Sequence, residues 1–168
     1  MKVHLGCGKV HMDGYVNVDI DGNPDLKADI MNLPFEDNSI EEIISIATFE
    51  HFYRWDAIDL LKDFYRMLIK PGGVLILETP DLMKMAEIFS KTGRFGWKLL
   101  TTPVGRISKA WQAFYGDQYS KNVYQTHKYV WTNSELEEEM VKAGFSVTNE
   151  IAQYHVPARD MRVVGVIL

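Results

Sequence analysis

Short apolar runs alternate with stretches of helical periodicity along the chain. The apolar runs predict strands at residues 2–5, 15–20, 26–30, 42–47, 74–77, 145–154 and 161–168. Apolar positions three and four residues apart, together with capping residues, predict helices at residues 56–68, 81–90, 107–114 and 132–143. Strands that alternate with helices are typical of βαβ units and of a mostly parallel sheet.

Turn and cap residues mark where several of these elements end. The sequence Pro71-Gly72-Gly73 ends the helix for which Asp56 is the expected N-cap. Thr132 followed by Glu135 has the capping-box pattern, and Gly144 ends the helix that follows. The last two strands are joined by residues 157–160 only, which are too few for a crossover helix, so we expect these strands to pair antiparallel.

Composition narrows the class of protein. The 168 residues are 46% hydrophobic and 24% charged, which is typical of one globular domain. No apolar run approaches the roughly 18 residues that a membrane span needs. The single cysteine, Cys7, excludes an internal disulfide and a cysteine zinc site. We expect a cytoplasmic protein, a monomer or a homodimer, and the net charge of −5 argues against nucleic acid as its partner.

One segment departs from this acidic average. Residues 91–131 contain seven lysines and arginines, one aspartate and nine of the aromatic residues. The segment is longer than an ordinary connection between a strand and a helix. We therefore expect a single domain over residues 1–168, in which residues 91–131 form a basic, aromatic-rich lid that contacts the substrate.

The first predicted strand ends in a glycine turn, and the second ends in a carboxylate. Gly6 and Gly8 let a ligand approach the backbone closely, and Asp19 is placed to accept hydrogen bonds from ribose hydroxyls. Only residues 9–14 separate the turn from the second strand. Six residues make less than two helical turns, so we expect a loop where nucleotide-binding sheets usually have a full helix.

These residues, with others in order along the chain, resemble the class I S-adenosylmethionine-dependent methyltransferases, in a small branch with a shortened first helix. The matching stretches are 3–8, 16–19, 28–30, 33–39, 49–51, 66–73 and 143–145. The resemblance implies a doubly wound α/β domain with a Rossmann-like, mostly parallel seven-strand sheet. The expected strand order is 3-2-1-4-5-7-6, with the last strand antiparallel.

The resemblance also implies a cofactor site for S-adenosylmethionine. Its methionine part would lie against the glycine turn, its ribose at the end of the second strand, its adenine beside the third, and its methyl group after the fourth. The residues expected there are Gly6, Cys7, Gly8, Asp19, Ile20, Asp29, Ile30, Thr48 and Glu50. Some quinone-type methyltransferases hold a metal with a glutamate three residues before such a Glu-His pair. Ala47 occupies that position here, so we expect no metal.

Two histidines are candidates for the catalytic base, and His127 is the one we favour. His51 follows Glu50, and His127 lies in the aromatic segment just before the capped helix. The candidate substrate contacts in the same segment are Tyr115, Asp117, Gln118 and Lys128. A positive lid over an acidic domain would attract an anionic acceptor.

The expected function is therefore methyl transfer from S-adenosylmethionine to a small, anionic metabolite. Two alternatives remain open. One is a binding module that keeps the cofactor fold without turnover, and the shortened first helix motivates it. The other is a nicotinamide-dependent oxidoreductase, which would use the same glycine turn and carboxylate.

Overall fold

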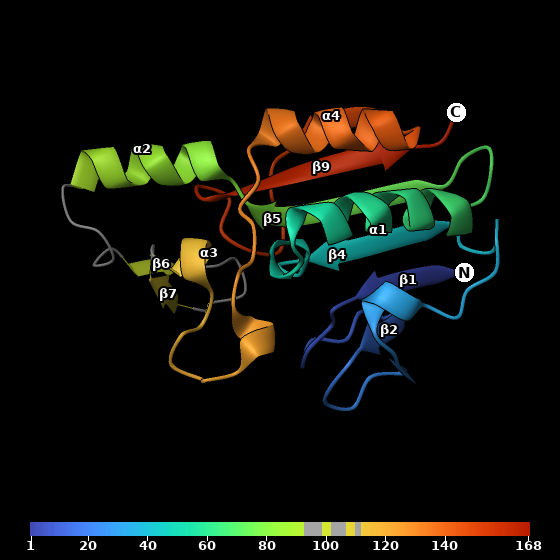
Figure 1. Ribbon diagram of the computed structural model, residues 1–168, viewed down its shortest axis with the longest axis horizontal. Coiled ribbons are helices and arrows are strands. Elements are labelled where there is room, and N and C mark those ends of the chain that lie inside the picture. Colours follow the sequence, from blue (N-terminus) through green and yellow to red (C-terminus); the bar gives the residue numbers. More distant parts are fainter. Residues whose placement is uncertain (93–98, 102–106, 110–111) are drawn as a thin grey trace.

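The computed structural model describes residues 1–92, 99–101, 107–109 and 112–168. Its main feature is a seven-stranded sheet in the order β3-β2-β1-β4-β5-β9-β8 (Figure 1). The strands are β1 (Lys2–Leu5), β2 (Val16–Asp19), β3 (Leu26–Lys27), β4 (Glu42–Ile46), β5 (Val74–Pro80), β8 (Ser146–Glu150) and β9 (Asp160–Val166). This is the expected order 3-2-1-4-5-7-6, so the predicted topology is confirmed.

The first five strands of the sheet are parallel, and β9 runs against them. β9 pairs antiparallel with β5 on one side and with β8 on the other. The predicted antiparallel pair at the end of the chain is therefore confirmed. The carboxyl ends of the parallel strands meet at one edge of the sheet, where ligands bind in such folds.

Two helices cover one face of the sheet. These are α1 (Arg54–Met67) and α4 (Asn133–Ala143), which lie side by side in Figure 1 over β4, β5 and β9. The largest apolar cluster lies beneath them, and its members come from both the strands and the helices. They include Val3, Leu5, Ile43, Leu61, Phe64, Leu75, Leu77, Leu136, Met140 and Val163, all fully or almost fully buried.

The ends of α4 agree with the sequence, whereas the start of α1 does not. The Thr132 hydroxyl oxygen accepts a hydrogen bond from the Glu135 amide at 3.2 Å, and Gly144 ends α4 with a φ of 111°. Helix α1 begins at Arg54, so the prediction of Asp56 as its N-cap was wrong. Asp56 lies in the first turn, where its carboxylate favours the helix through the macrodipole instead.

The connection between β1 and β2 contains turns and no helix, as its length predicts. Val10 donates to Cys7 and Tyr15 donates to Met12 in single turns. After β3, which is shorter than the run 26–30 suggests, the chain makes the short 3-10 helix η1 (Ile30–Asn32). Two further 3-10 helices are η2 (Phe49–His51) and η3 (Val123–Gln125).

The insertion after β5 differs most from expectation. It begins with α2 (Leu82–Thr92), close to the predicted 81–90, and continues with β6 (Leu99–Thr101), β7 (Ile107–Lys109) and α3 (Gln112–Tyr115). The helix predicted over 107–114 was therefore wrong in its first part, because Ile107–Lys109 pairs with Leu99–Thr101 in a small antiparallel sheet. Residues 93–98, 102–106 and 110–111 of the predicted lid lie outside the described residues.

No helix in the part of the chain that the structure describes is long and apolar enough to cross a membrane.

Candidate active site

The glycine turn after β1 combines close packing with open space. Gly6 and Gly8 have φ values of 69° and 55°, in the left-handed region that glycine adopts most readily. A Cβ atom on Gly6 would lie 2.2 Å from the Thr48 hydroxyl oxygen, whereas one on Gly8 would meet nothing within 4 Å. Gly6 thus lets the turn pack under Thr48, and Gly8 leaves room for a ligand above it.

Asp19 at the end of β2 holds this turn in place. One of its carboxylate oxygens accepts the Gly8 amide at 2.7 Å, and the other accepts the Asp21 amide at 3.0 Å. An ionised carboxylate has about four lone-pair positions. Asp19 therefore fixes the glycine turn and keeps acceptor capacity for ligand hydroxyls.

Asp29 and Ile30 lie where the third strand gives way to η1. The Asp29 carboxylate accepts the Met31 amide at 2.9 Å and caps this short helix. Ile30 is buried beside it. A carboxylate next to an apolar side chain suits a flat, polar-edged ring such as adenine.

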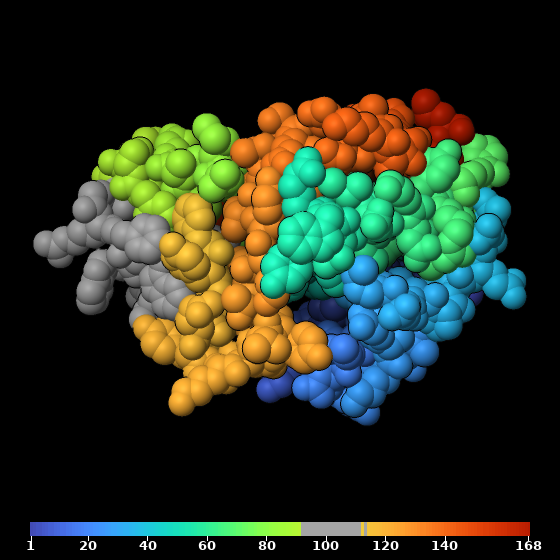
Figure 2. All heavy atoms as spheres, in the orientation of Figure 1, coloured from blue at the N-terminus to red at the C-terminus, as the bar shows by residue number. Residues whose placement is uncertain are grey.

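These residues line one cavity of about 540 Å³, within the range of small-molecule sites. Figure 2 shows a hollow below α1, between the N-terminal segment and the segment around residues 120–130. The predicted residues that line the cavity are Gly6, Cys7, Gly8, Asp19, Ile20, Asp29, Ile30, Thr48, His51 and Lys128. The structure thus brings most of the expected cofactor residues together at the carboxyl edge of the sheet.

The other predicted site residues do not line this cavity. Tyr115 is exposed, the Asp117 carboxylate accepts the Tyr119 amide, and the Gln118 amide donates to the Tyr115 carbonyl. The side chains of Asp117 and Gln118 therefore stabilise turns of the insertion. Glu50 and His127 lie behind the cavity wall.

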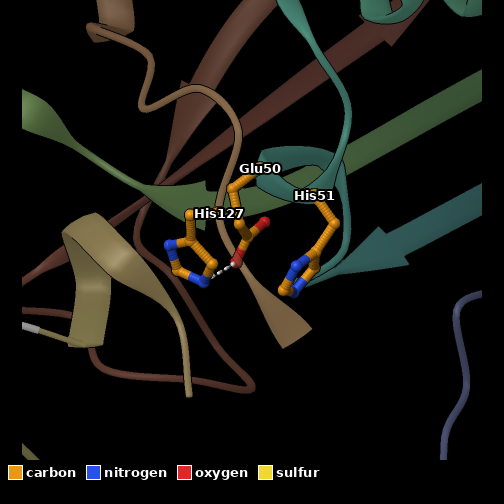
Figure 3. A group of neighbouring side chains, drawn as sticks. All are labelled: Glu50, His51 and His127. Atoms are coloured by element: carbon orange, nitrogen blue, oxygen red, sulfur yellow. Dashed lines mark ion pairs between the residues drawn. The ribbon is translucent and has the colours of Figure 1, made fainter. Parts of the chain in front are cut away.

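Glu50, His51 and His127 form a cluster at this wall (Figure 3). Glu50 is only 1% exposed, and one of its carboxylate oxygens accepts a hydrogen bond from the Thr79 hydroxyl at 2.9 Å. The other carboxylate oxygen lies 3.8 Å from Nε2 of His127. The two imidazole rings meet edge to face, with 4.8 Å between their centroids.

Backbone contacts attach the insertion to this cluster. The carbonyl oxygen of Glu50 accepts the amides of Lys128 and Tyr129, at 2.8 and 3.3 Å. The Lys128 ammonium group lies 6.0 Å from the centroid of the Tyr53 ring and donates to the Val123 carbonyl. Segments that are distant in the sequence are thereby joined at one wall of the cavity.

His51 is held in one tautomer by its neighbour. Its Nδ1 lies 3.2 Å from the carbonyl oxygen of Thr126, which can only accept a hydrogen bond. Nδ1 therefore carries the proton, and Nε2 of the neutral ring keeps a lone pair. A ring nitrogen in this state can accept a proton or bind a cation.

Sequence reasoning missed Tyr154 and His155, which also line the cavity. They belong to the turn between β8 and β9, where the predicted strand 145–154 ends early. The fully buried Glu78 carboxylate accepts the amides of Gln153, Tyr154 and His155 at 2.6–2.9 Å. The only signal in the sequence was a glutamate in the apolar strand 74–80.

A second buried carboxylate holds the same turn. Asp160 accepts hydrogen bonds from Nδ1 of His155 at 2.6 Å and from the Val156 amide at 2.8 Å. Burial raises the pKa of the Asp160 carboxyl, but the hydrogen bonds from His155 and Arg159 outweigh it, so its pKa lies below the ordinary value. Burial also lowers the pKa of His4 and raises the pKa of the Cys7 thiol.

Known proteins share both the sequence pattern and the fold. Residues 4–77 match the family model described as a methyltransferase domain. No curated protein matches the chain.

Solved structures match over nearly the whole chain. An S-adenosylmethionine-dependent methyltransferase from Thermotoga maritima is 18% identical, with a TM-score of 0.61, covering 99% of this chain and 82% of its own. One from Archaeoglobus fulgidus is 12% identical, with a TM-score of 0.65, covering 98% and 85%. The complex of DhpI with S-adenosylhomocysteine is 12% identical, with a TM-score of 0.59, covering 98% and 74%.

At these identities the solved structures establish the fold. The family match adds the sequence pattern of β2, β3 and β4, of the end of β1 and of the first part of β5. Many of the residues that line the cavity lie within this matched range. The chain therefore has the fold of the class I, S-adenosylmethionine-dependent methyltransferases, and its residues 4–77 carry the sequence pattern of a methyltransferase domain.

Proposed function

We propose that the protein transfers the methyl group of S-adenosylmethionine to a small, anionic metabolite. The observation that carries this proposal is the composition of the cavity at the carboxyl edge of the sheet. It combines a glycine turn and the carboxylates of Asp19 and Asp29 with imidazole rings and two lysines. The first set suits a nucleoside cofactor, and the second suits an acceptor that is negative and has a proton to lose.

The cofactor would lie along the carboxyl ends of β1, β2 and β3. Its methionine part fits the open space above Gly8, and Asp19 would accept two ribose hydroxyls. Asp29 and Ile30 would hold the adenine edge and face. When bound, the cofactor supplies an electrophilic methyl group on a sulfonium. Thr48, packed on Gly6, would face that end.

His51 is the residue we propose as base, because its ring lines the cavity and Nε2 has the lone pair. His127 lies behind His51. Its imidazole faces the Glu50 carboxylate, and this pair supports the cavity wall to which His51 belongs. In-line transfer needs the acceptor atom, the methyl carbon and the sulfur aligned. Proton acceptance is needed only if the acceptor atom carries a proton.

Lys9 and Lys128 line the cavity and are the positive groups that would contact an anionic acceptor. Residues 112–131 approach from the insertion, with Tyr124 and Gln125 on the wall. We propose that residues 91–131 act as a lid within a domain that spans residues 1–168. These lysines would attract anionic groups on the acceptor, and added salt would weaken this attraction.

A labelled-methyl assay tests this proposal. Purified protein is incubated with cofactor labelled in its methyl group and with metabolite pools separated by anion exchange. We expect labelled product in the anionic fractions and slower turnover as salt rises. Label confined to neutral fractions would exclude an anionic acceptor, and no transfer to any pool would favour a binding module.

A further inference from the structure

We infer that Glu50, His51 and His127 form a binding site for a divalent transition-metal cation. One ligand atom from each residue lies within 4.8 Å of the others, in the described part of the chain. Figure 3 shows the Glu50 carboxylate between the two imidazole rings. The sequence pattern of Ala47, Glu50 and His51 predicted no metal, but the third ligand here comes from the distant insertion, which no local spacing reveals.

The burial of Glu50 calls for a positive partner. A carboxylate that is 1% exposed is costly unless it is paired or coordinates a metal. Thr79 satisfies one oxygen, while the other faces His127 at 3.8 Å, which is too long for a hydrogen bond. A cation between this oxygen and the two rings would give the carboxylate a positive partner that all three side chains share.

The hydrogen-bond partners of His51 and Glu50 are of the kind that metal ligands usually have. Metal-bound histidines commonly donate their other N–H to a carbonyl, and ligating carboxylates are themselves hydrogen-bonded. Thr126 accepts from His51, and Thr79 donates to Glu50. His51 can then bind through Nε2 and Glu50 through its second oxygen.

Two imidazoles and a carboxylate suit zinc and similar first-row cations. Zinc ligands at about 2.0–2.2 Å from the metal lie roughly 3–3.5 Å apart, so the cluster must contract when the cation binds. Rotation of the two histidine rings would supply this movement. Because His51 lines the cavity, the open coordination position would face the acceptor.

The use of the cation rests on the proposed function, whereas the site itself rests on the geometry. A bound cation would lower the pKa of an acceptor hydroxyl or hold an anionic oxygen. His51 would then be a ligand instead of the base. The aromatic segment would thereby be tied to the cavity wall through His127.

The test uses the metals alone. Protein freed of metal by a chelator is titrated with Zn²⁺ in a calorimeter, and with Co²⁺ while the visible absorption is recorded. We expect one cation per chain and the intense Co²⁺ bands of a tetrahedral nitrogen and oxygen site. Glu50→Gln and His127→Ala should each weaken Zn²⁺ binding at least tenfold.

Two controls make the result decisive. His11→Ala removes an exposed histidine outside the cluster and should bind Zn²⁺ like the parent. Circular dichroism and S-adenosylhomocysteine titration show whether each variant is folded. Weak binding that is equal in all folded variants would overturn the inference. Undiminished methyl transfer by the chelated protein would overturn the cation's role in activating the acceptor and leave the proposed function intact.

Discussion

Gly6 and Gly14 are a matched pair of single residues that separates backbone strain from packing. Both have positive φ, 69° and 83°, but an added Cβ would strike Thr48 at Gly6 and meet nothing within 4 Å at Gly14. We predict that Gly14→Ala costs about 1–2 kcal/mol from backbone strain. Gly6→Ala should cost a further 1–3 kcal/mol or so from overpacking.

Urea unfolding of both glycine variants measures this difference. Equal midpoints would show that Thr48 moves aside without cost. Gly6→Ala should also weaken cofactor binding, because a displaced Thr48 disturbs the wall next to the glycine turn. The Gly14 variant should bind the cofactor like the parent.

Asp19 should be important for binding the ribose of the cofactor. Its carboxylate would accept two ribose hydroxyls, each worth about 1.5–3 kcal/mol as a hydrogen bond to a charged group. Asp19→Ala should therefore weaken S-adenosylhomocysteine binding at least tenfold, as measured by calorimetry. Asp59→Ala, an exposed aspartate on α1, is the control. Unchanged affinity in a folded Asp19 variant would place the ribose elsewhere.

Individual residues were predictable where a local pattern determines them. The glycines and carboxylates at strand ends follow from the order of strands, and they line the cavity as expected. Tyr154 and His155 were not predictable, because their place depends on a buried carboxylate from another strand. Asp117 and Gln118 have polar side chains that form hydrogen bonds within local turns, and sequence alone cannot distinguish that use from ligand binding.

Among the helices and strands, the capped helix α4 gives a direct test. The Thr132 hydroxyl satisfies the Glu135 amide, one of the free donors at the helix start. Thr132→Ala should lower the free energy of unfolding by about 0.5–2 kcal/mol, whereas Thr132→Ser should keep most of it. Urea denaturation measures both variants, and an equal loss in the serine variant would rule out the cap as the cause.

Because Asp160 holds the turn between β8 and β9, we expect the free energy of unfolding to fall at low pH. The folded-state pKa of Asp160 is lowered by its hydrogen bonds, so its stabilisation is present above the ordinary pKa of 3.8 and is lost as the pH falls through the folded value. We predict that Asp160→Asn is less stable than the parent at neutral pH, and that the gap narrows below about pH 4. Thermal unfolding at a series of pH values measures the difference in stability between the parent and the variant. A difference that stays constant with pH would contradict the stabilising role given to the Asp160 carboxylate.

Elements were predicted well where periodicity is strong and local. The parallel strands other than β3, and helix α4, agree with their sequence patterns. The helix expected over 107–114 failed because Ile107–Lys109 pairs with Leu99–Thr101, a long-range contact that helical spacing does not report. Helix α1 begins earlier than predicted, because Arg54 and Trp55 already have helical backbone and precede Asp56, the expected cap residue.

At the scale of the whole molecule, the seven-stranded sheet, its order and its antiparallel last pair follow from the alternation of elements and the short final turn. The shortened connection between β1 and β2 leaves a cavity walled by loops and by the insertion. How the insertion docks on Glu50 could not be predicted, because backbone amides of residues 128 and 129 make the contact.

The most direct test of the account is a comparison of two ligands on the intact protein. Calorimetric titration with S-adenosylhomocysteine should show binding in the micromolar range, with one ligand per chain, and Asp19→Ala should weaken it. Titration with NAD under the same conditions should show no binding. Micromolar binding of NAD with no binding of S-adenosylhomocysteine would contradict the assignment of this cavity to methyl transfer.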